Sequence, residues 1–325
     1  MTKDAVLEIL WENADRYVSG AELARRLSLS RTAVWKAVEQ LRQESYAIRS
    51  VTNKGYCLSS DSDVLSAQGV EKYLRRGDLR LQVYRSISST NTVLKALAAE
   101  GAEAGLALIA GEQTAGRGRM GRSFYSPPDT GLYMSLLLRP RIGAQEATGI
   151  TACAAVAVAE TIEELSGLET RIKWVNDVQI AGKKVCGILT EAAIDCESGL
   201  MDYVIVGIGI NTRLPEGDFP PELREIAGSV FGREPVPELR CRLAAGVLDR
   251  LADGCERLEE KYFFEDYRRR SLVLGKEINI LSPGRDPVPA TALELDRDFA
   301  LIVRLRDGSI RRLNSGEVSI RLPEA

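Results

Sequence analysis

The stretch TAGRGRMGRSFYSPPDTG, residues 114–131, contains a G-x-G-x-x-G pattern at Gly116, Gly118 and Gly121. In a dinucleotide-binding fold, this pattern follows a strand and opens a helix directly after it. The apolar residues 106–110 are a suitable strand, but a Pro-Pro pair and an Asp-Thr-Gly turn follow the glycines, which favours a loop. The stretch therefore argues against a doubly wound fold. It predicts a flexible loop, called the arginine loop below, whose backbone can approach a ligand closely.

On both sides of this loop, the chain alternates between short apolar segments and amphipathic ones. We expect strands at 81–86, 106–110, 131–138, 170–175, 185–191 and 203–210. We expect helices at 91–100, 145–166 and 238–270. This mixture predicts an α+β fold with a mixed or mainly antiparallel sheet and helices packed on it. After Leu272 the sequence contains only short strands and turns, which predicts a small β-barrel.

The first 60 residues predict a helix-turn-helix with a basic wing. After a first helix, Ser19 and Glu22 have the spacing of a capping box that starts a second helix. Ser30 can cap a third helix, which would be the recognition helix of the motif. A hairpin turning at Asn53-Lys54-Gly55 would form the wing, and the polar stretch 59–67 is expected to be a linker. A generic helical bundle with a solvated basic face is the alternative.

The expected third helix separates apolar residues from polar ones. Its buried face, with helical spacing, consists of Val34, Ala37, Val38 and Leu41. The opposite face carries the candidate DNA-binding residues Arg31, Thr32, Trp35 and Lys36. Between Gly20 and Gly55 the net charge is +4, whereas the whole chain carries −3. A basic module on an acidic body indicates an anionic partner for that module.

The chain of 325 residues contains no histidine. This excludes Ser-His-Asp and Cys-His catalysis and every metal site that needs a histidine ligand. The six cysteines are scattered without a C-x-x-C pair, as expected of small apolar residues in a reducing compartment. The charged N-terminus does not resemble a signal peptide, and no apolar run is long enough to span a bilayer. We therefore expect a cytoplasmic protein of two or three domains.

Four stretches of the middle region place polar residues or glycines where a plain core would not. The first is SISSTN, in which three hydrogen-bonding side chains in a row can surround a neutral polar ligand, although one of them is also a helix cap. The second is Gln113 with the arginine loop. The third is RIKWVNDVQIAGKKVCGILTE, residues 171–191, and the fourth is VGIGINTR.

In the third stretch, Lys173, Asn176 and Asp177 are expected to end one strand, and Lys183-Lys184 to open the next. Each stretch by itself is weak, because KWVND is compatible with an ordinary strand end and the two lysines with an ordinary hairpin tip. Together, GRGRMGR, KWVND, KKVCGILTE and GIGIN, in this order behind SSTN, resemble the biotin–protein ligases. They resemble specifically the bifunctional members that double as biotin-operon repressors.

The resemblance covers nearly the whole chain and implies three domains. These are a winged helix-turn-helix at 1–62, a catalytic domain of the class II synthetase and biotin–lipoyl ligase type at 63–270, and an SH3-like β-barrel at 271–325. One departure is visible, because Val175 stands where family members commonly have proline. No chemical group is lost by this difference.

The resemblance also implies an activity and partners. The family joins biotin to ATP, with Mg²⁺, to form biotinyl-5′-AMP and pyrophosphate, and then transfers biotin to a lysine of the biotin carboxyl carrier protein. With biotinyl-5′-AMP as corepressor, a homodimer binds operator DNA and represses biotin genes. Attack by an amine needs no enzyme nucleophile, which explains how a chain without histidine can transfer an acyl group.

The residues that match the family's motifs fall into three groups. The biotin-binding candidates are Ser89, Thr90, Asn91, Gln113, Arg117, Gly118, Arg119 and Lys184. The ATP- and adenylate-binding candidates are Arg117, Arg119, Arg122, Asn176 and Asn211. The catalytic candidates are Lys184, Arg119 and Asp177. Asp177 is expected either to accept the proton of the incoming amine or to hold Mg²⁺.

Lys184 rather than Lys183 is the expected ligand contact. It stands two residues before the Cys186-Gly187 pair, as in the family, and strand alternation puts Lys183 on the opposite face. Two alternative functions remain. A lipoate ligase of the same fold would need an apolar channel rather than the polar residues of SSTN, and a ligand-sensing transcription factor would need no catalytic residues.

Overall fold

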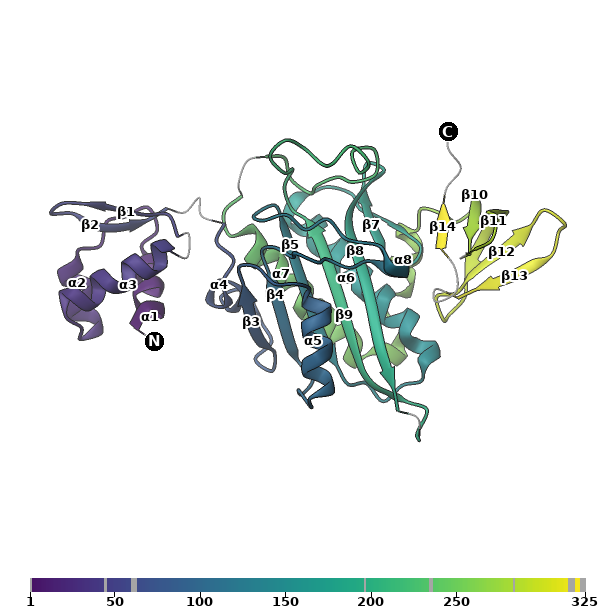
Figure 1. Ribbon diagram of the computed structural model, residues 1–325, viewed down its shortest axis with the longest axis horizontal. Coiled ribbons are helices and arrows are strands. Elements are labelled where there is room, and N and C mark those ends of the chain that lie inside the picture. The colour runs from purple at the N-terminus through teal and green to yellow at the C-terminus, as the bar shows by residue number, and fades with distance from the viewer. Residues whose placement is uncertain are drawn as a thin grey trace. The chain divides into compact units, whose positions relative to one another are not determined.

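The computed structural model describes residues 2–43, 46–59, 63–195, 197–233, 236–282, 284–314 and 319–321 (Figure 1). The chain forms two compact units, Met1–Tyr73 with Glu234–Arg242, and Leu74–Arg233 with Leu243–Ala325. The predicted domain boundary at residue 62, residues 60–62 of the predicted linker and Cys196 lie outside the described residues.

The first unit contains the predicted helix-turn-helix and hairpin. Its elements are α1 (Thr2–Glu12), α2 (Gly20–Leu27), α3 (Arg31–Gln43), β1 (Ile48–Val51), β2 (Gly55–Leu58) and α4 (Ala67–Glu71). The Ser19 hydroxyl accepts a hydrogen bond from the Glu22 amide at 3.1 Å, and the Ser30 hydroxyl accepts one from the Ala33 amide at 3.1 Å. Both predicted caps are therefore confirmed, and each fixes the start of a helix.

The hairpin of β1 and β2 is antiparallel and depends on one glycine. Gly55 has a φ of +107°, and a Cβ added there would lie 2.1 Å from the carbonyl oxygen of Val18. No other residue fits this position without moving the backbone before α2. The glycine thereby lets the hairpin pack closely on the helices.

The second unit is built on a seven-stranded mixed sheet in the order β3-β4-β5-β9-β8-β7-β6. The pair β3–β4 is parallel, and the other pairs are antiparallel, as predicted for a mixed sheet. The strands are β3 (Arg80–Tyr84), β4 (Leu106–Ala110), β5 (Gly131–Leu138), β6 (Arg171–Lys173), β7 (Asp177–Ile180), β8 (Lys183–Ile194) and β9 (Met201–Asn211).

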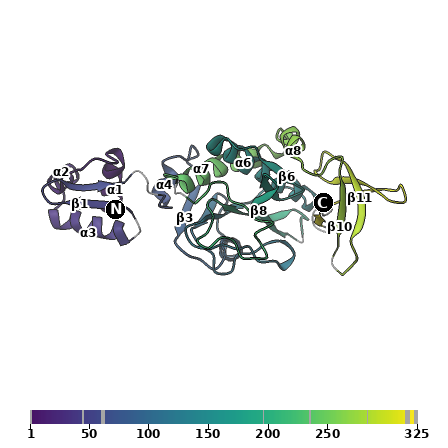
Figure 2. The ribbon, with the colours of Figure 1, turned by 90° about the horizontal axis from the view of Figure 1, so that it is seen from above.

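Helices cover both faces of this sheet. Figure 1 shows α5 (Thr90–Ala99) in front of it and α6 (Ala147–Ser166) and α7 (Leu239–Glu256) behind it, and Figure 2 shows α6 and α7 along one side. A shorter helix, α8 (Phe264–Arg270), packs against α6. In the part of the chain that the structure describes, no helix is both long and apolar enough to cross a membrane.

Two predicted elements differ from the structure. The helix expected at 238–270 is broken into α7, a 3₁₀ turn at Leu258–Glu260 and α8. Arg257, with φ −110° and ψ 28°, leaves helical geometry after α7, and the left-handed φ of 49° at Lys261 separates the 3₁₀ turn from α8. The strand expected at 170–175 ends at Lys173, because Lys173 pairs with Asp177 and closes a tight hairpin. The residues Trp174-Val175-Asn176 are therefore a turn rather than a strand end, and the Trp174–Val175 peptide is cis.

The C-terminal part of the second unit is a five-stranded antiparallel sheet in the order β13-β12-β11-β10-β14. Its strands are β10 (Glu277–Leu281), β11 (Val288–Leu295), β12 (Leu301–Leu305), β13 (Ile310–Leu313) and β14 (Ser319–Arg321). Between β11 and β12, Phe299 packs into the other part of the unit. Its ring stacks on Phe263 with centroids 5.4 Å apart, and its carbonyl accepts the indole N–H of Trp174 at 2.9 Å. The sheet thus contacts the turn between β6 and β7.

Candidate functional site

One pocket brings together most of the residues singled out in the sequence. It lies where the start of α5, the arginine loop and the middle of β8 and β9 meet. The predicted residues that line it are Ser89, Thr90, Asn91, Gln113, Arg117, Gly118, Arg119, Asn176 and Lys184. Gly207 and Gly209 of VGIGINTR line it as well, so residues from all four stretches share a single site.

The start of α5 supplies one side of the pocket, and Gln113 ties it to the arginine loop. Ser89 caps the helix, with its hydroxyl accepting from the Thr92 amide at 3.5 Å. The Gln113 carbonyl oxygen accepts from the Thr90 amide at 2.9 Å, and its NH₂ group donates to the Ser126 hydroxyl at 3.2 Å. The amide orientation of Gln113 is thereby fixed from both ends.

Beneath these residues, Ser135 on β5 is completely buried. Its hydroxyl lies 2.6 Å from the Asn91 carbonyl oxygen and 2.7 Å from the Thr90 hydroxyl. Asn91 donates its NH₂ protons to the Leu189 carbonyl at 3.2 Å and to the Glu191 carboxylate at 3.0 Å, so its oxygen must face Ser135. We call Ser89, Thr90, Asn91, Gln113 and Ser135 the pocket floor.

The proton directions in the pocket floor follow from counting donors. The Asn91 oxygen can only accept, so the single proton of Ser135 points to it. Ser135, at 2.7 Å, and the Gln113 carbonyl oxygen, at 3.2 Å, then compete for the single proton of Thr90. Thr90 Oγ1 consequently keeps its lone pairs for another donor. The pocket floor therefore offers an acceptor to an N–H group of a ligand.

Glycines on the sheet make room for the side chains above it. A Cβ at Gly207 would lie 1.9 Å from the Asn91 carbonyl oxygen, so Asn91 can occupy its place only over a glycine. Cβ atoms at Gly187 and Gly209 would lie 3.0 and 2.6 Å from the ring of Phe124. The glycines of GIGIN and VCGIL thus allow Asn91 and Phe124 to lie directly on the strands.

Lys184 and Lys183 point in opposite directions, as strand alternation predicts. Lys184 lines the pocket, and its ammonium group lies 2.7 Å from the Asp177 carboxylate and 5.9 Å from the centre of the Phe124 ring. Lys183 is exposed and donates to the carbonyl of Arg224 at 2.8 Å. Only Lys184 therefore brings a cation to the pocket from this pair.

The arginine loop contributes two more cations. Arg117 forms an ion pair with Glu191 at 3.1 Å, and Arg119 donates to the Asn176 carbonyl oxygen at 3.1 Å. Burial lowers the pKa of Arg119, while the nearby carboxylate of Asp177 opposes this shift. An arginine stays protonated even so, which makes Arg119 a partly desolvated positive charge beside the pocket.

Three predicted residues do not line the pocket. Asp177 lies behind Lys184 and reaches the site through that ion pair. Arg122 is exposed on the arginine loop, and the NH₂ group of Asn211 donates to the carbonyl of Gly228 at 3.0 Å. In this structure these three side chains are therefore neighbours of the site rather than parts of its wall.

Sequence reasoning missed Ser135, Phe124 and Glu191. Ser135 is a single polar residue inside the apolar strand GLYMSLLL, and this was the available signal. Phe124 and Glu191 stand inside the quoted stretches, but which ring or carboxylate meets the pocket depends on the folded sheet. The described cysteines are buried or half-buried, and burial raises the pKa of Cys186, so they behave as apolar residues.

A second candidate site lies on α3 in the first unit. Val34, Ala37, Val38 and Leu41 are buried, as predicted. On the opposite face, Trp35 is 53% exposed. Arg31, Thr32 and Lys36 are exposed as well, so the basic face is open to an anionic partner.

Comparisons with known proteins agree with this arrangement. The model of the Biotin/lipoate A/B protein ligase family matches residues 83–211, an HTH domain model matches 2–57, and the Biotin protein ligase C terminal domain matches 273–321. The bifunctional ligase/repressor BirA of Bacillus subtilis is 41% identical over 227 residues, which is 69% of each chain.

The bifunctional ligase/repressor BirA of Salmonella typhimurium is 31% identical over 317 residues, or 94% of each chain. Among solved structures, the biotin protein ligase from Aquifex aeolicus in complex with biotin and ATP is similar, with a TM-score of 0.62 and 28% identity. That match covers 75% of this chain and 99% of the other.

Proposed function

Because the chain belongs to the biotin protein ligase family, among its bifunctional ligase/repressors, we infer that its pocket forms biotinyl-5′-AMP and serves its transfer to a carrier lysine. One observation carries this inference. A neutral, hydrogen-bonding floor and three cations, Arg117, Arg119 and Lys184, line the same pocket. A ligand with a neutral polar ring and an anionic end, such as biotin joined to a phosphate, fits both halves.

The pocket floor suits the ureido ring of biotin. The Thr90 hydroxyl oxygen can accept from a ureido N–H, and the Ser89 hydroxyl proton can be donated to the ureido oxygen. Both residues are buried, so these hydrogen bonds would form away from water and would be correspondingly strong. The ring would thereby be held with the biotin carboxylate directed toward the cations.

In the first step, a biotin carboxylate oxygen attacks the α-phosphorus of ATP, an O–P bond forms, and pyrophosphate leaves. Both reactants are anionic, so the approach requires positive charge. Lys184 and Arg119, which line the pocket, would neutralise the negative charge of the two reactants, and a partly desolvated cation acts more strongly than one in water. We assign catalysis of this step to these two residues.

A divalent cation would assist by neutralising the phosphates of ATP. Among the described residues, no group of three or more Asp, Glu, Cys or His side chains gathers to form a metal cage. Mg²⁺ is usually held by one or two carboxylates together with substrate phosphates, so a single carboxylate beside the phosphates would be enough. Asp177, beside Lys184, is the carboxylate that we propose for this role.

In the second step, the amine of a carrier lysine attacks the acyl carbon of biotinyl-5′-AMP, and AMP leaves with its phosphate. The amine must lose a proton, and accepting this proton is the alternative role that we propose for Asp177. The arginine loop would meanwhile keep water from the reactive mixed anhydride. We propose the biotin carboxyl carrier protein as the acceptor.

The test of the ligase is direct. The protein is incubated with biotin, ATP, Mg²⁺ and a carrier domain, and the intact mass of the carrier is measured. We expect one biotinyl group per carrier and none when ATP is omitted. Transfer of lipoate instead would identify a lipoate ligase, and an unmodified carrier would indicate a ligand sensor without catalysis.

For the first unit we propose operator binding by the exposed face of α3, with biotinyl-5′-AMP as corepressor. The net charge of +4 between Gly20 and Gly55 provides few phosphate contacts, and each adds only a salt-sensitive increment. Two modules on adjacent half-sites double the contacts, so we propose a homodimer that forms when biotinyl-5′-AMP is bound. Both activities are proposed to take place in the cytoplasm.

The repressor is tested by sedimentation and by operator gel shifts, with and without biotin and ATP. We expect dimer formation and a shifted operator only with both ligands. The double variant Arg31→Ala/Lys36→Ala should lose the shift and keep carrier biotinylation. Normal operator binding by this variant would show that the recognition face lies elsewhere, and a ligand-independent dimer would remove assembly as the switch.

A further inference from the structure

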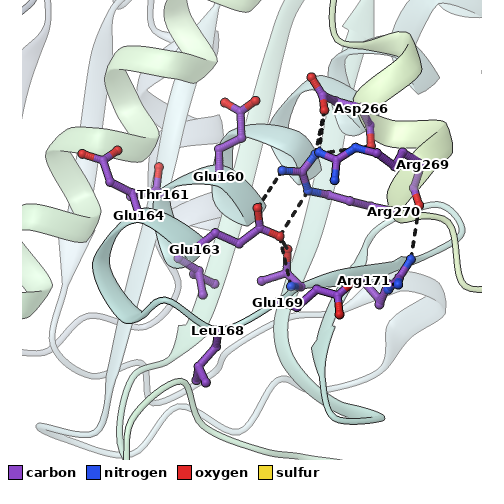
Figure 3. Close-up of polar contacts among 12 residues, drawn as sticks. Glu160, Thr161, Glu163, Glu164, Leu168, Glu169, Arg171, Asp266, Arg269 and Arg270 are labelled. Carbon is purple, nitrogen blue, oxygen red and sulfur yellow. Dashed lines mark hydrogen bonds and ion pairs between the residues drawn. The ribbon is translucent and has the colours of Figure 1, made fainter.

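Ion pairs and hydrogen bonds connect helix α8 to the rest of the second unit (Figure 3). The guanidinium of Arg270 is almost completely buried and lies 2.7 Å from the Glu163 carboxylate of α6 and 3.0 Å from Asp266. Glu163 also accepts from the amide and the hydroxyl of Thr170, at 3.0 and 2.7 Å. One carboxylate thus joins α6, α8 and the residue before β6.

This network is charged at neutral pH. Burial by itself would raise the pKa of Glu163, but the hydrogen bonds from Arg270 and Thr170 outweigh it and hold the pKa below the usual range. A buried arginine that lost its carboxylate would be strongly unfavourable. The position of α8 relative to α6 is therefore well determined.

One turn before Arg270, Tyr267 points from α8 toward the candidate site. Its side chain is completely buried, and its hydroxyl donates to the carbonyl of Val175 at 3.0 Å. Burial raises the pKa of Tyr267, so the hydroxyl keeps its proton and acts as the donor. The ring packs edge-on against Phe299 with centroids 5.5 Å apart, which leaves it little freedom to rotate away.

Val175 immediately precedes Asn176, whose side chain connects two parts of the pocket. The Asn176 oxygen accepts from Arg119 at 3.1 Å, and its NH₂ group donates to the Ile188 carbonyl at 2.9 Å. The Ile188 amide in turn donates to the Asn176 carbonyl at 2.9 Å. The peptide before Asn176 is held by Tyr267, so the placement of Arg119 depends on a residue outside the pocket.

We propose that Tyr267 is a positioning residue for adenylate formation, acting through the Val175 carbonyl on Asn176 and so on Arg119. The proposal rests on the proposed ligase function. Tyr267 does not line the pocket, so it acts on the ligand only through these residues. Without its hydroxyl, the buried Val175 carbonyl would lose its partner, and the turn between β6 and β7 would be free to shift.

The test is the variant Tyr267→Phe, which removes only the hydroxyl. Biotin-dependent release of pyrophosphate should slow roughly tenfold in kcat, as expected for one buried hydrogen bond, while the Kd for biotin stays unchanged. Asn176→Ala should produce the same pattern. In the Asn176→Ala background, Tyr267→Phe should then have almost no further effect on kcat, because the two act as one unit.

Tyr133→Phe is the matched control. Tyr133 is also a buried tyrosine whose hydroxyl donates to a backbone carbonyl, that of Pro127 at 3.2 Å. Its effect should add to that of Asn176→Ala, because it does not contact the turn. Additive losses for Tyr267→Phe would overturn the proposal, and so would a normal kcat for either Tyr267→Phe or Asn176→Ala. If Tyr267→Phe is poorly folded, a normal kcat for Asn176→Ala would still overturn the proposal.

These outcomes are distinct from failure of the proposed function. If the unmodified chain releases no pyrophosphate with biotin and ATP, the ligase function is wrong. If the unmodified chain is active and Tyr267→Phe is equally active, only the role of Tyr267 is wrong.

Discussion

The pocket floor and the arginine loop border the same site, but they are built in opposite ways. Ser89, Thr90 and Asn91 are each at most 4% exposed, and their side chains form hydrogen bonds. On the arginine loop, by contrast, Met120 is 48% exposed with a left-handed φ of 57°, and Arg122 is exposed.

We propose that this difference separates recognition from reaction. A floor whose side chains are already held by hydrogen bonds can bind a neutral ring with little reorganisation, which lowers the cost of binding. A loop with exposed cations can rearrange around a polyphosphate and then close over a reactive product. We therefore expect floor variants to change biotin affinity, and variants on the cationic side to change adenylate formation or retention.

The largest effect should come from Lys184→Ala, on the cationic side. Loss of one cation that stabilises the transition state should slow adenylate formation by ~10²–10³, whereas Lys183→Ala should have little effect because Lys183 bonds to the Arg224 carbonyl. The measurement is biotin-dependent pyrophosphate release from both variants. Equal losses, or a larger loss for Lys183→Ala, would contradict the assignment.

Arg119→Gly should impair both adenylate formation and retention of the product. We expect the variant still to make biotinyl-5′-AMP, but more slowly, because one cation of the first step is lost, and to release it roughly 10- to 100-fold faster, because a charge-assisted contact to the ligand is lost. The assay adds an unrelated protein and measures biotin on its lysines, where released adenylate reacts. If adenylate formation itself disappears, the arginine loop acts first in catalysis and only second as a lid.

Ser135→Ala tests the pocket floor. Removing this buried hydroxyl leaves the Asn91 oxygen without its donor and removes the contact to Thr90, so biotin should bind roughly tenfold more weakly. Calorimetric titration with biotin in the absence of ATP measures this directly. Thr151→Ala is the control. It removes a hydroxyl on α6 that is hydrogen-bonded to the hydroxyl of Thr190 on β8, and it should leave biotin affinity unchanged.

The smallest effect should come from Arg122→Ala. Its side chain is exposed, and exposed charges contribute little, so pyrophosphate release should stay within about threefold of the unmodified chain and biotin affinity should not change. The rate of pyrophosphate release is measured by steady-state kinetics at varied ATP concentration. A loss approaching that of Lys184→Ala would mean that the loop carries Arg122 into the site when ATP binds.

The sequence alone predicts the parts of the fold that depend on local pattern. The strands at 106–110 and 131–138 coincide with β4 and β5, because glycines flank β4 on both sides, an Asp-Thr-Gly turn starts β5 and an Arg-Pro pair follows it. The break between α7 and α8 was missed, since neither glycine nor proline marks Lys261. The turn at Trp174-Val175-Asn176 was also missed, because the pairing of Lys173 with Asp177 that creates it is a property of the folded hairpin.

The same division applies to the site. Residues that stand in polar or basic motifs, such as Thr90, Gln113 and Lys184, were predictable, and the structure places them in one pocket. Ser135 and Tyr267 were not, because each acts through a contact with a residue at least 40 positions away in the sequence. Such supporting residues become visible only when strands and helices are assembled.

The indole of Trp174, held by the Phe299 carbonyl, also gives the protein an optical property. The emission of an indole depends on the polarity around it, and the three tryptophans occupy three different surroundings. Trp174 is buried beside the turn, Trp35 is exposed on α3, and Trp11 is half-buried in α1. A chain with Trp11→Phe and Trp35→Phe would keep a single intrinsic fluorophore next to Asn176, so events at the ligand site could be followed without any label.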